Sequence, residues 1–342
     1  MNAKKPRSSA VTIEDVALAA GVHVATVSRA LREGGMVAPA TREKVQAAAR
    51  RLGYRPNVAA ATLRTRRSSL VGVIVTDLGN PFFGPILKGL ETELRKSGWM
   101  SLVVQPPEDA AGRRDVVLAL ADRQVGGLII GAAEIDDPLL DTADGLQLPV
   151  VLVNRGYGER RFPSIVTDDR ESMRLALDHL LALGHRHIAH IAGPRSSSTG
   201  RARAEAFGDL CRQQGIGDAI IVETPAFTRA AGNEAALSVL DVAAPPTAVV
   251  AGNDMLALGV LDAAGHCGLS VPGDLSLVGH NDMPLVDLID PPLTTIRVPV
   301  EQLSRQAARL LIEQMHNADE AVMMRVMMPS LVVRASTGPA RR

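Results

Sequence analysis

Val24, Ala25 and Arg29 share a short stretch in which apolar residues recur at helical spacing. The guanidinium group of an arginine can donate two hydrogen bonds to O6 and N7 of guanine, and short apolar side chains can contact the methyl group of thymine. Ala25 and Arg29 are one helical turn apart, so one helix face could present both kinds of contact. We predict that these three residues read base edges, with Arg29 bound to solvent or a phosphate as the alternative.

The segment that positions these residues runs from Thr12 to Arg32 and has the pattern of two short helices joined at Gly21. Glycine permits a sharp bend between helices. Asp15, three residues after Thr12, suits a capping box, and His23 occupies the N-cap position of the second helix. Apolar residues recur at helical spacing at Val16, Ala17, Ala20, Val24, Val27 and Leu31. The pattern predicts a helix-turn-helix, whose second helix enters the DNA major groove; the alternative is a helical hairpin in a globular core.

The distribution of charge favours DNA as a partner. Residues 1–67 contain 13 Lys or Arg and four Asp or Glu, a net charge of +9, and because the whole chain is neutral the remainder carries −9. A basic head on an acidic body is typical of a protein whose head contacts nucleic acid. Hydroxyl groups near the helix ends are candidates for phosphate contacts: Thr12, Thr26 and Ser28.

Length and composition limit the class of protein. A chain of 342 residues is expected to form two or three domains. No apolar run approaches the roughly 20 residues of a membrane span, and no apolar segment follows the basic N-terminus as in a secretory signal. Cys211 and Cys267 lack the spacing of metal ligands, so we expect them to be small hydrophobic residues in a reducing compartment. We therefore expect a cytoplasmic protein without membrane association.

Signatures of catalysis, cofactors and metals are missing from the sequence. There is no phosphate-binding GxxxxGK[ST], no GxGxxG after a strand and no HExxH. His185, His187 and His190 are close in sequence, but their spacing in a strand places them on different faces, which disfavours a metal site. We expect a protein that is not an enzyme and that carries no cofactor and no metal.

A strand-and-helix alternation begins at Leu70. The candidate buried strands are Leu70–Val75, Leu102–Val104, Gly127–Ile130, Val150–Val153, His187–Ile191, Ala219–Val222, Ala248–Ala251 and Leu275–Val278. The candidate helices between them are Phe83–Lys96, Arg113–Asp122, Arg170–Leu183, Arg201–Gln214, Ala230–Leu240 and Asp254–Ala264. This alternation predicts an α/β fold with two doubly wound parallel-sheet subdomains behind an all-α head. Ligands of such sheets bind beyond the carboxyl ends of the strands, which predicts a cleft between the subdomains.

Several short motifs occur in a characteristic order along the chain. They are T-I-E-D-V-A at 12–17, A-T-V-S-R at 25–29, L-G-Y-R-P-N at 52–57, N-P-F-F at 80–83, L-G-H-R-H-I at 183–188, G-N-D-M-L-A-L-G at 252–259 and P-P-L-T-T-I at 291–296. In this order the chain resembles the lactose-repressor/galactose-repressor family of bacterial transcription factors from Val11 to about Ser336. The resemblance implies a periplasmic-binding-protein-like body and a homodimer that grips a near-palindromic operator. It also implies an operator affinity controlled by a small molecule in the cleft.

The resemblance extends the set of DNA-binding candidates. His23 stands where the family usually has serine at the start of the recognition helix. Residues 57–64 match the family's hinge helix, in which Leu63 corresponds to the leucine that the family wedges into the minor groove. The alternative for this stretch is a simple flexible linker. The DNA-binding residues beyond the helix-turn-helix are then Asn57, Leu63 and Arg64.

The resemblance also implies a set of effector-binding residues. They are Phe82, Phe83, Asn154, Thr199, Arg203, Phe227, Asn253 and Asn281. For Phe82 and Phe83 the alternative is core packing, and for Arg203 it is a surface salt bridge on a helix. Asn154 and Asn281 stand where the family more often has aspartate. Two neutral amides in place of two acids would repel an anionic effector less, so the expected effector is a sugar or a sugar acid.

The predicted domains are a disordered basic tail (1–10), the helix-turn-helix domain (11–56), a hinge helix and linker (57–69) and an effector-binding and dimerisation domain (70–338). Within the last, one subdomain is expected at about 70–166 and 297–322 and the other at about 167–294 and 323–338. We expect the dimer interface near Pro85–Leu94 and Pro284–Ile289. The predicted function is an effector-controlled transcriptional regulator, most often a repressor in this family; the alternative is a solute-binding protein without a DNA function.

Overall fold

The computed structural model describes residues 11–31, 36–54, 68–131, 133–156, 162–216, 219–317 and 323–341. The predictions of a disordered tail (1–10) and a hinge helix (57–64) therefore lie outside the described residues. The chain divides into two compact units, Met1–Arg67 and Ser68–Arg342. We call them the head and the body.

The head contains three helices, α1 (Ile13–Ala20), α2 (Val24–Ala30) and α3 (Pro39–Leu52). Their apolar faces meet in a small core that includes Val16, Val27 and Val45, each fully buried. Gly21 ends α1 in the left-handed region at φ 56°, a conformation that costs glycine little. The predicted helix-turn-helix is thus present, and α3 packs against it as a third helix.

The body contains two six-stranded sheets. The first has the order β11-β5-β4-β3-β1-β2, and all its strands are parallel. Its strands are β1 (Leu70–Ile74), β2 (Met100–Val104), β3 (Leu128–Ile130), β4 (Val150–Val153), β5 (Ser164–Thr167) and β11 (Met324–Met327). Val73 lies in register between Val103 and Ile129. Such continuously apolar strands are typical of parallel sheets covered on both faces.

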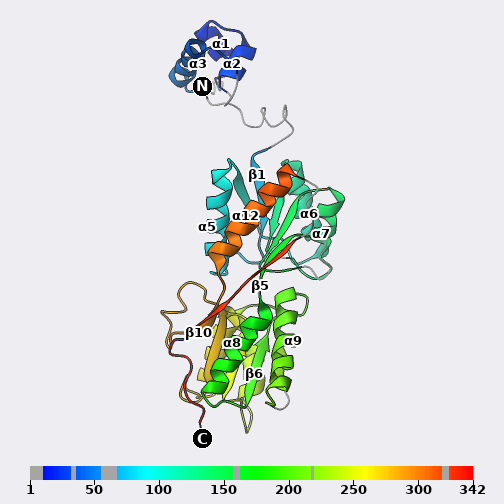
Figure 1. Cartoon of the computed structure of the whole chain (residues 1–342), viewed down its shortest axis with the longest axis vertical. Helices are drawn as coiled ribbons and strands as arrows, with labels where there is room; N and C mark the ends of the chain where they lie inside the picture. Colours follow the sequence, from blue (N-terminus) through cyan, green and yellow to red (C-terminus); the bar gives the residue numbers. More distant parts are fainter. Residues whose placement is uncertain are drawn as a thin grey trace, which may run out of the picture. The chain divides into compact units, whose positions relative to one another are not determined.

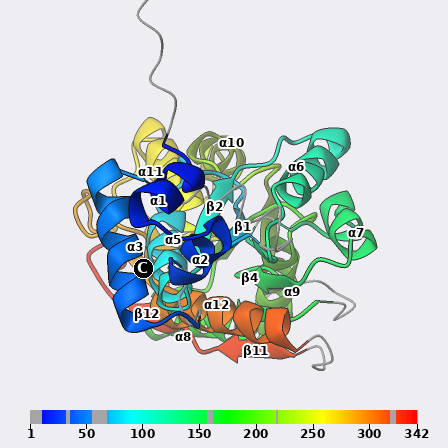
Figure 2. The same cartoon turned by 90° about the horizontal axis from the view of Figure 1, so that it is seen from above.

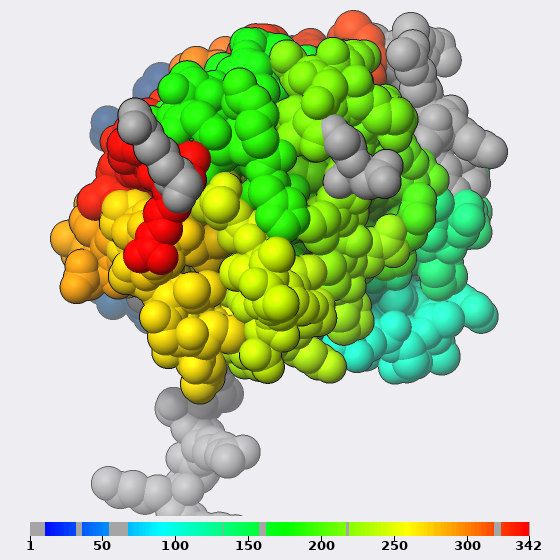
Figure 3. Space-filling model, turned by 90° about the horizontal axis from the view of Figure 1, so that it is seen from below, coloured from blue at the N-terminus to red at the C-terminus, as the bar shows by residue number. Residues whose placement is uncertain are grey.

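The second sheet has the order β12-β10-β9-β8-β6-β7 and is parallel except for the antiparallel pair β10–β12. Its strands are β6 (Ile188–Ala192), β7 (Ile220–Glu223), β8 (Ala248–Ala251), β9 (Ser276–Asn281), β10 (Thr294–Arg297) and β12 (Ser330–Val332). The C-terminal segment runs along this subdomain (Figure 3). Ala340 N donates to Leu183 O at 2.9 Å.

Helices cover both faces of each sheet. In the first subdomain, α5 (Phe83–Lys96) and α12 (Val300–His316) pack on one face and α6 (Ala110–Asp122) and α7 (Pro138–Gly145) on the other (Figures 1 and 2). In the second, α10 (Arg229–Leu240) and α11 (Asp254–His266) cover one face and α8 (Asp169–Ala182) and α9 (Ser198–Gln213) the other. The predicted doubly wound α/β body is therefore correct.

The chain passes between the two subdomains at three places in the described residues. It leaves the first sheet at Thr167, returns between Arg297 and Val300, and leaves again between Met327 and Ser330. The expected assignment of all of 323–338 to the second subdomain is wrong, because β11 pairs with β5 in the first sheet. The half-exposed strand β11 has no buried apolar run that sequence patterns could detect. Strands β5, β10 and β12 and helices α7 and α12 were likewise not predicted individually.

Among the described residues, no helix has both the length and the apolar character that crossing a bilayer requires.

Candidate functional site

The second helix of the head presents an exposed face. Ala25 and Arg29 are exposed, and Arg29 Nε donates to Ala25 O at 3.2 Å, which holds the guanidinium group along this face. Val24 is half-buried and packs against the head's core, so only part of its side chain is available for a base contact. Thr26 and Ser28 are also half-buried. Arg29 and Ala25 are therefore the best-placed base readers of the predicted set.

Local hydrogen bonds fix the starts of both head helices. Thr12 Oγ1 accepts from Asp15 N at 3.3 Å, and Thr12 N donates to the Asp15 carboxylate at 2.8 Å, which completes the predicted capping box. These bonds from the Thr12 backbone and hydroxyl lower the pKa of Asp15. His23 Nδ1 accepts from Ala25 N at 3.3 Å and so performs the capping role predicted for it. The remaining DNA-binding candidates, Asn57, Leu63 and Arg64, lie outside the described residues.

A pocket lies at the carboxyl ends of strands from both sheets of the body. Its cavity volume is about 30 Å³, room for about one water molecule, so the walls lie close together in this structure. It is lined by Thr76, Asn80, Phe82, Phe83, Asn154, Arg155, Thr199, Arg203, Phe227, Asn253 and Asn281. All eight residues predicted for the effector site are in this lining. The fold thus brings together eight predicted residues that are spread over 199 positions of the chain, from Phe82 to Asn281.

Aromatic rings form one part of the pocket wall. Phe82 and Phe83 are 3% and 5% exposed, and their ring centroids are 5.6 Å apart in an edge-to-face arrangement. The two rings therefore both line the pocket and pack in the core. The half-buried ring of Phe227 covers Gly193, where an added Cβ would lie 2.1 Å from the ring. Glycine at 193 is needed so that this ring can keep its place.

Arg203 is held rigidly beneath the pocket. Its side chain is buried, its Nε lies 2.7 Å from Asp169 Oδ1, and its Nη1 donates to Gly252 O at 2.6 Å. Burial raises the pKa of Asp169, and the charge of Arg203 opposes that rise. The alternative of a surface salt bridge for Arg203 is wrong, because both side chains of this pair are largely excluded from solvent.

Three of the four asparagines in the lining, those predicted for the effector site, differ in their hydrogen bonds. Asn253 Oδ1 caps α11 by accepting from Leu256 N at 2.8 Å, so its amide nitrogen is the group left for a ligand. Asn281 Oδ1 lies 3.0 Å from His280 Nδ1. Asn154 has the left-handed φ of 67°, which asparagine tolerates, and its buried Oδ1 has no hydrogen-bond partner among the described residues.

Arg155 is a pocket residue that the sequence analysis missed. It is 7% exposed and its guanidinium group lies 5.8 Å from the centroid of the Phe227 ring. Burial lowers its pKa to about 10, so it remains charged at neutral pH. Its position directly after Asn154, at the end of a buried strand, could have indicated a pocket residue. The sequence alone, however, does not distinguish a buried arginine at this position from a solvent-exposed one.

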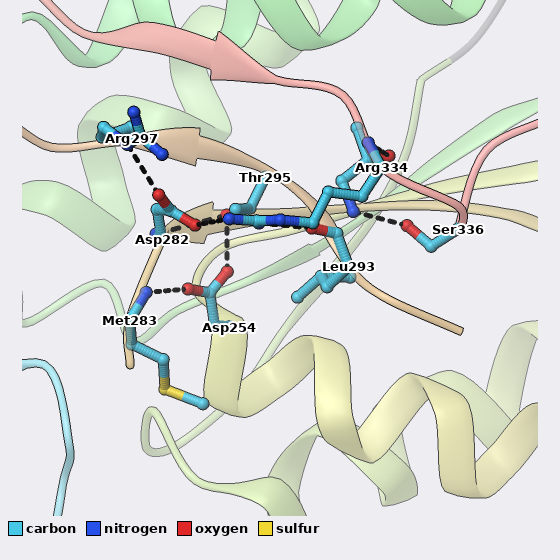
Figure 4. A network of polar contacts seen from close by, with 9 residues as sticks. Asp254, Asp282, Met283, Leu293, Thr295, Arg297, Arg334 and Ser336 are labelled. Carbon is cyan, nitrogen blue, oxygen red and sulfur yellow. Dashed lines mark hydrogen bonds and ion pairs between the residues drawn. The ribbon is translucent and has the colours of Figure 1, made fainter. Parts of the chain in front are cut away.

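A buried polar network supports the second subdomain's side of the pocket (Figure 4). The fully buried Asp254 accepts from Thr295 Oγ1 at 2.6 Å and from Met283 N at 2.8 Å. Asp282 forms ion pairs with Arg297 at 2.6 Å and Arg334 at 2.7 Å. Asp254 and Asp282 directly follow the lining residues Asn253 and Asn281 in the chain. The network therefore fixes the backbone from which both asparagines project.

Other residues that the sequence singled out have structural partners. Both nitrogens of His185 are engaged, by Thr247 Oγ1 and Gly338 O, and His190 Nδ1 lies 2.8 Å from Val250 O. Cys211 is buried, which raises its pKa to about 11, and Cys267 is half-buried. Within the described ranges, no group of three His, Cys, Asp or Glu could hold a metal ion.

A helix-turn-helix head with an exposed recognition face, on a body with a polar pocket at the carboxyl ends of strands from two sheets, defines a DNA-binding regulator. Residues 12–57 match the family model described as bacterial regulatory proteins, lacI family, and residues 177–337 match a periplasmic binding protein-like domain. The HTH-type transcriptional repressor CytR of Escherichia coli (strain K12) is 34% identical over 339 residues, which cover 98% of this chain and 99% of CytR. The chain belongs to the LacI family of bacterial transcriptional regulators.

Solved structures agree with this assignment. The Lac repressor dimer bound to operator and the anti-inducer ONPF has a TM-score of 0.86 at 29% identity and covers 96% of this chain and 100% of that chain. The transcriptional regulator CelR in complex with cellobiose has a TM-score of 0.74 at 29% identity, with coverage of 95% and 99%. The relatives are regulators and not enzymes, and they favour DNA binding over the alternative of a solute-binding protein.

Proposed function

We propose that this regulator acts as a cytoplasmic homodimer that represses transcription from a near-palindromic operator, and that a sugar or sugar derivative in the pocket controls its operator affinity. The observation that carries the proposal is the pocket itself, because its walls come from both subdomains. A ligand can shift a conformational equilibrium only through different affinities for the two states. When the two subdomains move relative to each other, the contacts of a ligand bound between them change. The two conformations therefore bind the ligand with different affinities.

The lining supports a polyol or sugar as the ligand. Asparagine amides and threonine hydroxyls can exchange hydrogen bonds with the hydroxyl groups of a ligand, and three phenylalanine rings can cover apolar sugar faces. The complex of CelR with cellobiose and the complex of the Lac repressor with operator support a sugar effector and an operator-bound dimer. The proposed effector-binding residues are the eight that the sequence predicted, together with Arg155.

In the head, we propose that Arg29 and Ala25 read base edges and that Thr12, His23, Thr26 and Ser28 contribute phosphate contacts, with Val24 giving a partial apolar contact. Each subunit would place its α2 in one major groove, so that a dimer reads two half-sites. The hinge residues Asn57, Leu63 and Arg64 would add contacts in the central minor groove.

The test combines operator selection with an effector screen. DNA selected from a random pool by the purified full-length protein is expected to contain an inverted repeat, and its affinity should fall steeply as salt rises. Fluorescence anisotropy on that operator is then repeated with sugars, sugar acids, sugar phosphates, polyols and nucleosides. A compound that changes operator affinity supports the proposal. Selection of no common sequence, or an operator affinity that no pocket ligand changes, would contradict it.

A further inference from the structure

The guanidinium group of Arg155 is buried in the pocket wall without an ion pair among the described residues. Within the same ranges, its Nε has no hydrogen-bond partner, and its one polar contact is a long bond of 3.5 Å from Nη1 to Ala133 O. Its guanidinium group also lies over the face of the Phe227 ring. A buried guanidinium group with unused donors is costly unless a partner arrives, and its planar donors match a carboxylate or a phosphate.

The acids near Arg155 do not supply that partner. The residues that line the pocket include two arginines and, in the described part of the chain, no carboxylate. Arg203 is already paired with Asp169, and the nearby buried Asp137 is paired with Arg113. Glu134 attracts Arg155 only from a distance, without an ion pair between these two described residues. One positive charge in the lining is therefore left for a ligand.

The second subdomain provides a complementary surface beside Arg155. Helix α9 begins at Ser198, and its buried N-cap residue Ser197 makes no side-chain cap bond but pairs its hydroxyl with Thr199 Oγ1 at 2.9 Å. Gly156 N donates to Ser198 Oγ at 3.1 Å, which ties the Arg155 loop to this helix start across the subdomain boundary. The positive end of a helix dipole favours anions. Arg155 and Thr199, which lies in the first turn of α9, line the same pocket, and the Gly156–Ser198 hydrogen bond joins the two segments that carry them.

We infer that the effector is anionic, with a carboxylate or phosphate group seated between Arg155 and the start of α9. This inference rests on the proposed function of the pocket as the effector site. The rest of the effector carries hydroxyl groups. One of these hydroxyl groups donates a hydrogen bond to Asn154 Oδ1, which has no partner among the described residues. Because the anion contacts both subdomains, Arg155 determines effector specificity and favours the arrangement in which Arg155 and the start of α9 are close.

The binding test uses matched neutral and anionic probes on the full-length protein. Glucose is compared with gluconate, glucuronate and glucose 6-phosphate, and ribose with ribose 5-phosphate, by calorimetry and thermal unfolding; inorganic phosphate and sulfate serve as the isolated anions. We expect anions to bind and the matched neutral sugars to bind about tenfold to a hundredfold more weakly. Carboxylates and phosphates are separate arms, so the preferred anion is identified. Equal affinity for a sugar and its acid, or no binding by any anion, would overturn the inference.

Variants separate the role of Arg155 from general electrostatics. Arg155→Gln should remove the preference for anions while retaining any weak binding of neutral sugars. Arg212→Gln on the exposed end of α9 removes the same charge outside the pocket and should leave the preference unchanged. Equal loss in the two variants would assign the effect to the overall charge of the protein and contradict a seat at Arg155.

Urea unfolding without ligand tests whether Arg155 has a purely structural role. Arg155→Met keeps most of the side-chain length and removes the unpaired charge, so without ligand it should unfold at the same or a higher urea concentration than the wild-type protein. Phosphate should then raise the unfolding midpoint of the wild-type protein and not that of the variant. A variant that is less stable without ligand would show that Arg155 supports the fold, and the inference would fail.

The outcomes also separate this inference from the proposed function. If neutral sugars bind and change operator affinity, the pocket is an effector site and only the anion inference fails. If anions bind through Arg155 but leave operator affinity unchanged, the anion seat stands and the regulatory role of the pocket fails.

Discussion

Arg203 Nε lies 2.7 Å from Asp169 Oδ1, and this ion pair joins two helices, α9 and α8, directly beneath the pocket. Both side chains are largely shielded from water, so each depends on the other to compensate its charge. Asp169 and Gly252 hold Nε and Nη1 of the guanidinium group, while Arg203 also lines the pocket. A pocket residue is thus also a structural support.

Removing one partner of this pair should therefore destabilise the body. Arg203→Gln leaves the Asp169 carboxylate buried and unpaired, and we expect a loss of about 3 to 5 kcal/mol in the free energy of unfolding, measured by urea denaturation. Arg201→Gln, two positions earlier on the same helix, is the control and should change stability little. A loss below about 1 kcal/mol in Arg203→Gln would show that the pair contributes no more than an exposed one.

The pH dependence of stability should contain a contribution from Asp254. Burial raises its pKa to about 7 from an ordinary value of 3.8. Because the folded state binds the proton more tightly than the unfolded state, the stabilising contribution is complete below about pH 4 and is lost as the pH rises to about 7.

Asp254→Asn cannot titrate, so urea denaturation between pH 4 and 8 should give a flatter stability profile for the variant than for the wild-type protein. A pKa that differs by one pH unit between the folded and unfolded states contributes about 1.4 kcal/mol, so the two profiles should diverge by several kcal/mol across this range. Parallel profiles would show that Asp254 stays ionised in the folded protein.

Base reading by Arg29 predicts a selective effect on DNA binding. Arg29→Ala should reduce operator affinity by about 1 to 3 kcal/mol and leave binding to random DNA much less affected, as measured by anisotropy at one fixed salt concentration. Arg95→Ala on the body is the control, because Arg95 pairs with Glu91 far along the chain from the head. Equal losses on operator and random DNA would make Arg29 a phosphate contact.

The proposed hinge contact of Leu63 predicts the same selectivity through a different mechanism. Leu63→Ala should weaken operator binding with little change in non-specific binding, because the leucine would stabilise only the kinked operator. The measurement is operator affinity together with DNA bending in a circular-permutation assay. Unchanged bending and affinity would favour a simple linker at 57–64.

The close contact between Gly193 and Phe227 predicts that a larger residue at position 193 impairs effector binding. In Gly193→Ala the added Cβ would overlap the ring of Phe227, which lines the pocket and would have to shift. We expect a loss of effector binding together with a destabilisation of about 1 to 3 kcal/mol. Gly145→Ala is the matched control, because an added Cβ there meets no described atom within 4 Å. Normal effector binding in Gly193→Ala would place the ligand away from Phe227.

Local chemistry made much of the fold predictable. The capping box of Thr12 and Asp15 and the bend at Gly21 depend on neighbours in the chain, so the sequence was sufficient to predict them. Buried parallel strands such as β4 and β8 are fully apolar and could be predicted directly. The eight residues predicted to line the cleft came from the resemblance to a family, which supplied their shared location.

The tertiary structure alone decided which residues lose contact with water and which strand joins which sheet. Strand β11 joins the first sheet although the segment after it joins the second, because pairing with β5 depends on partners about 160 positions away. Arg155 looks like an ordinary arginine in the sequence, and its burial without a countercharge in the described residues arises only where loops from both subdomains meet. Secondary structure follows from interactions between near neighbours, whereas burial and charge compensation depend on residues distant in the chain.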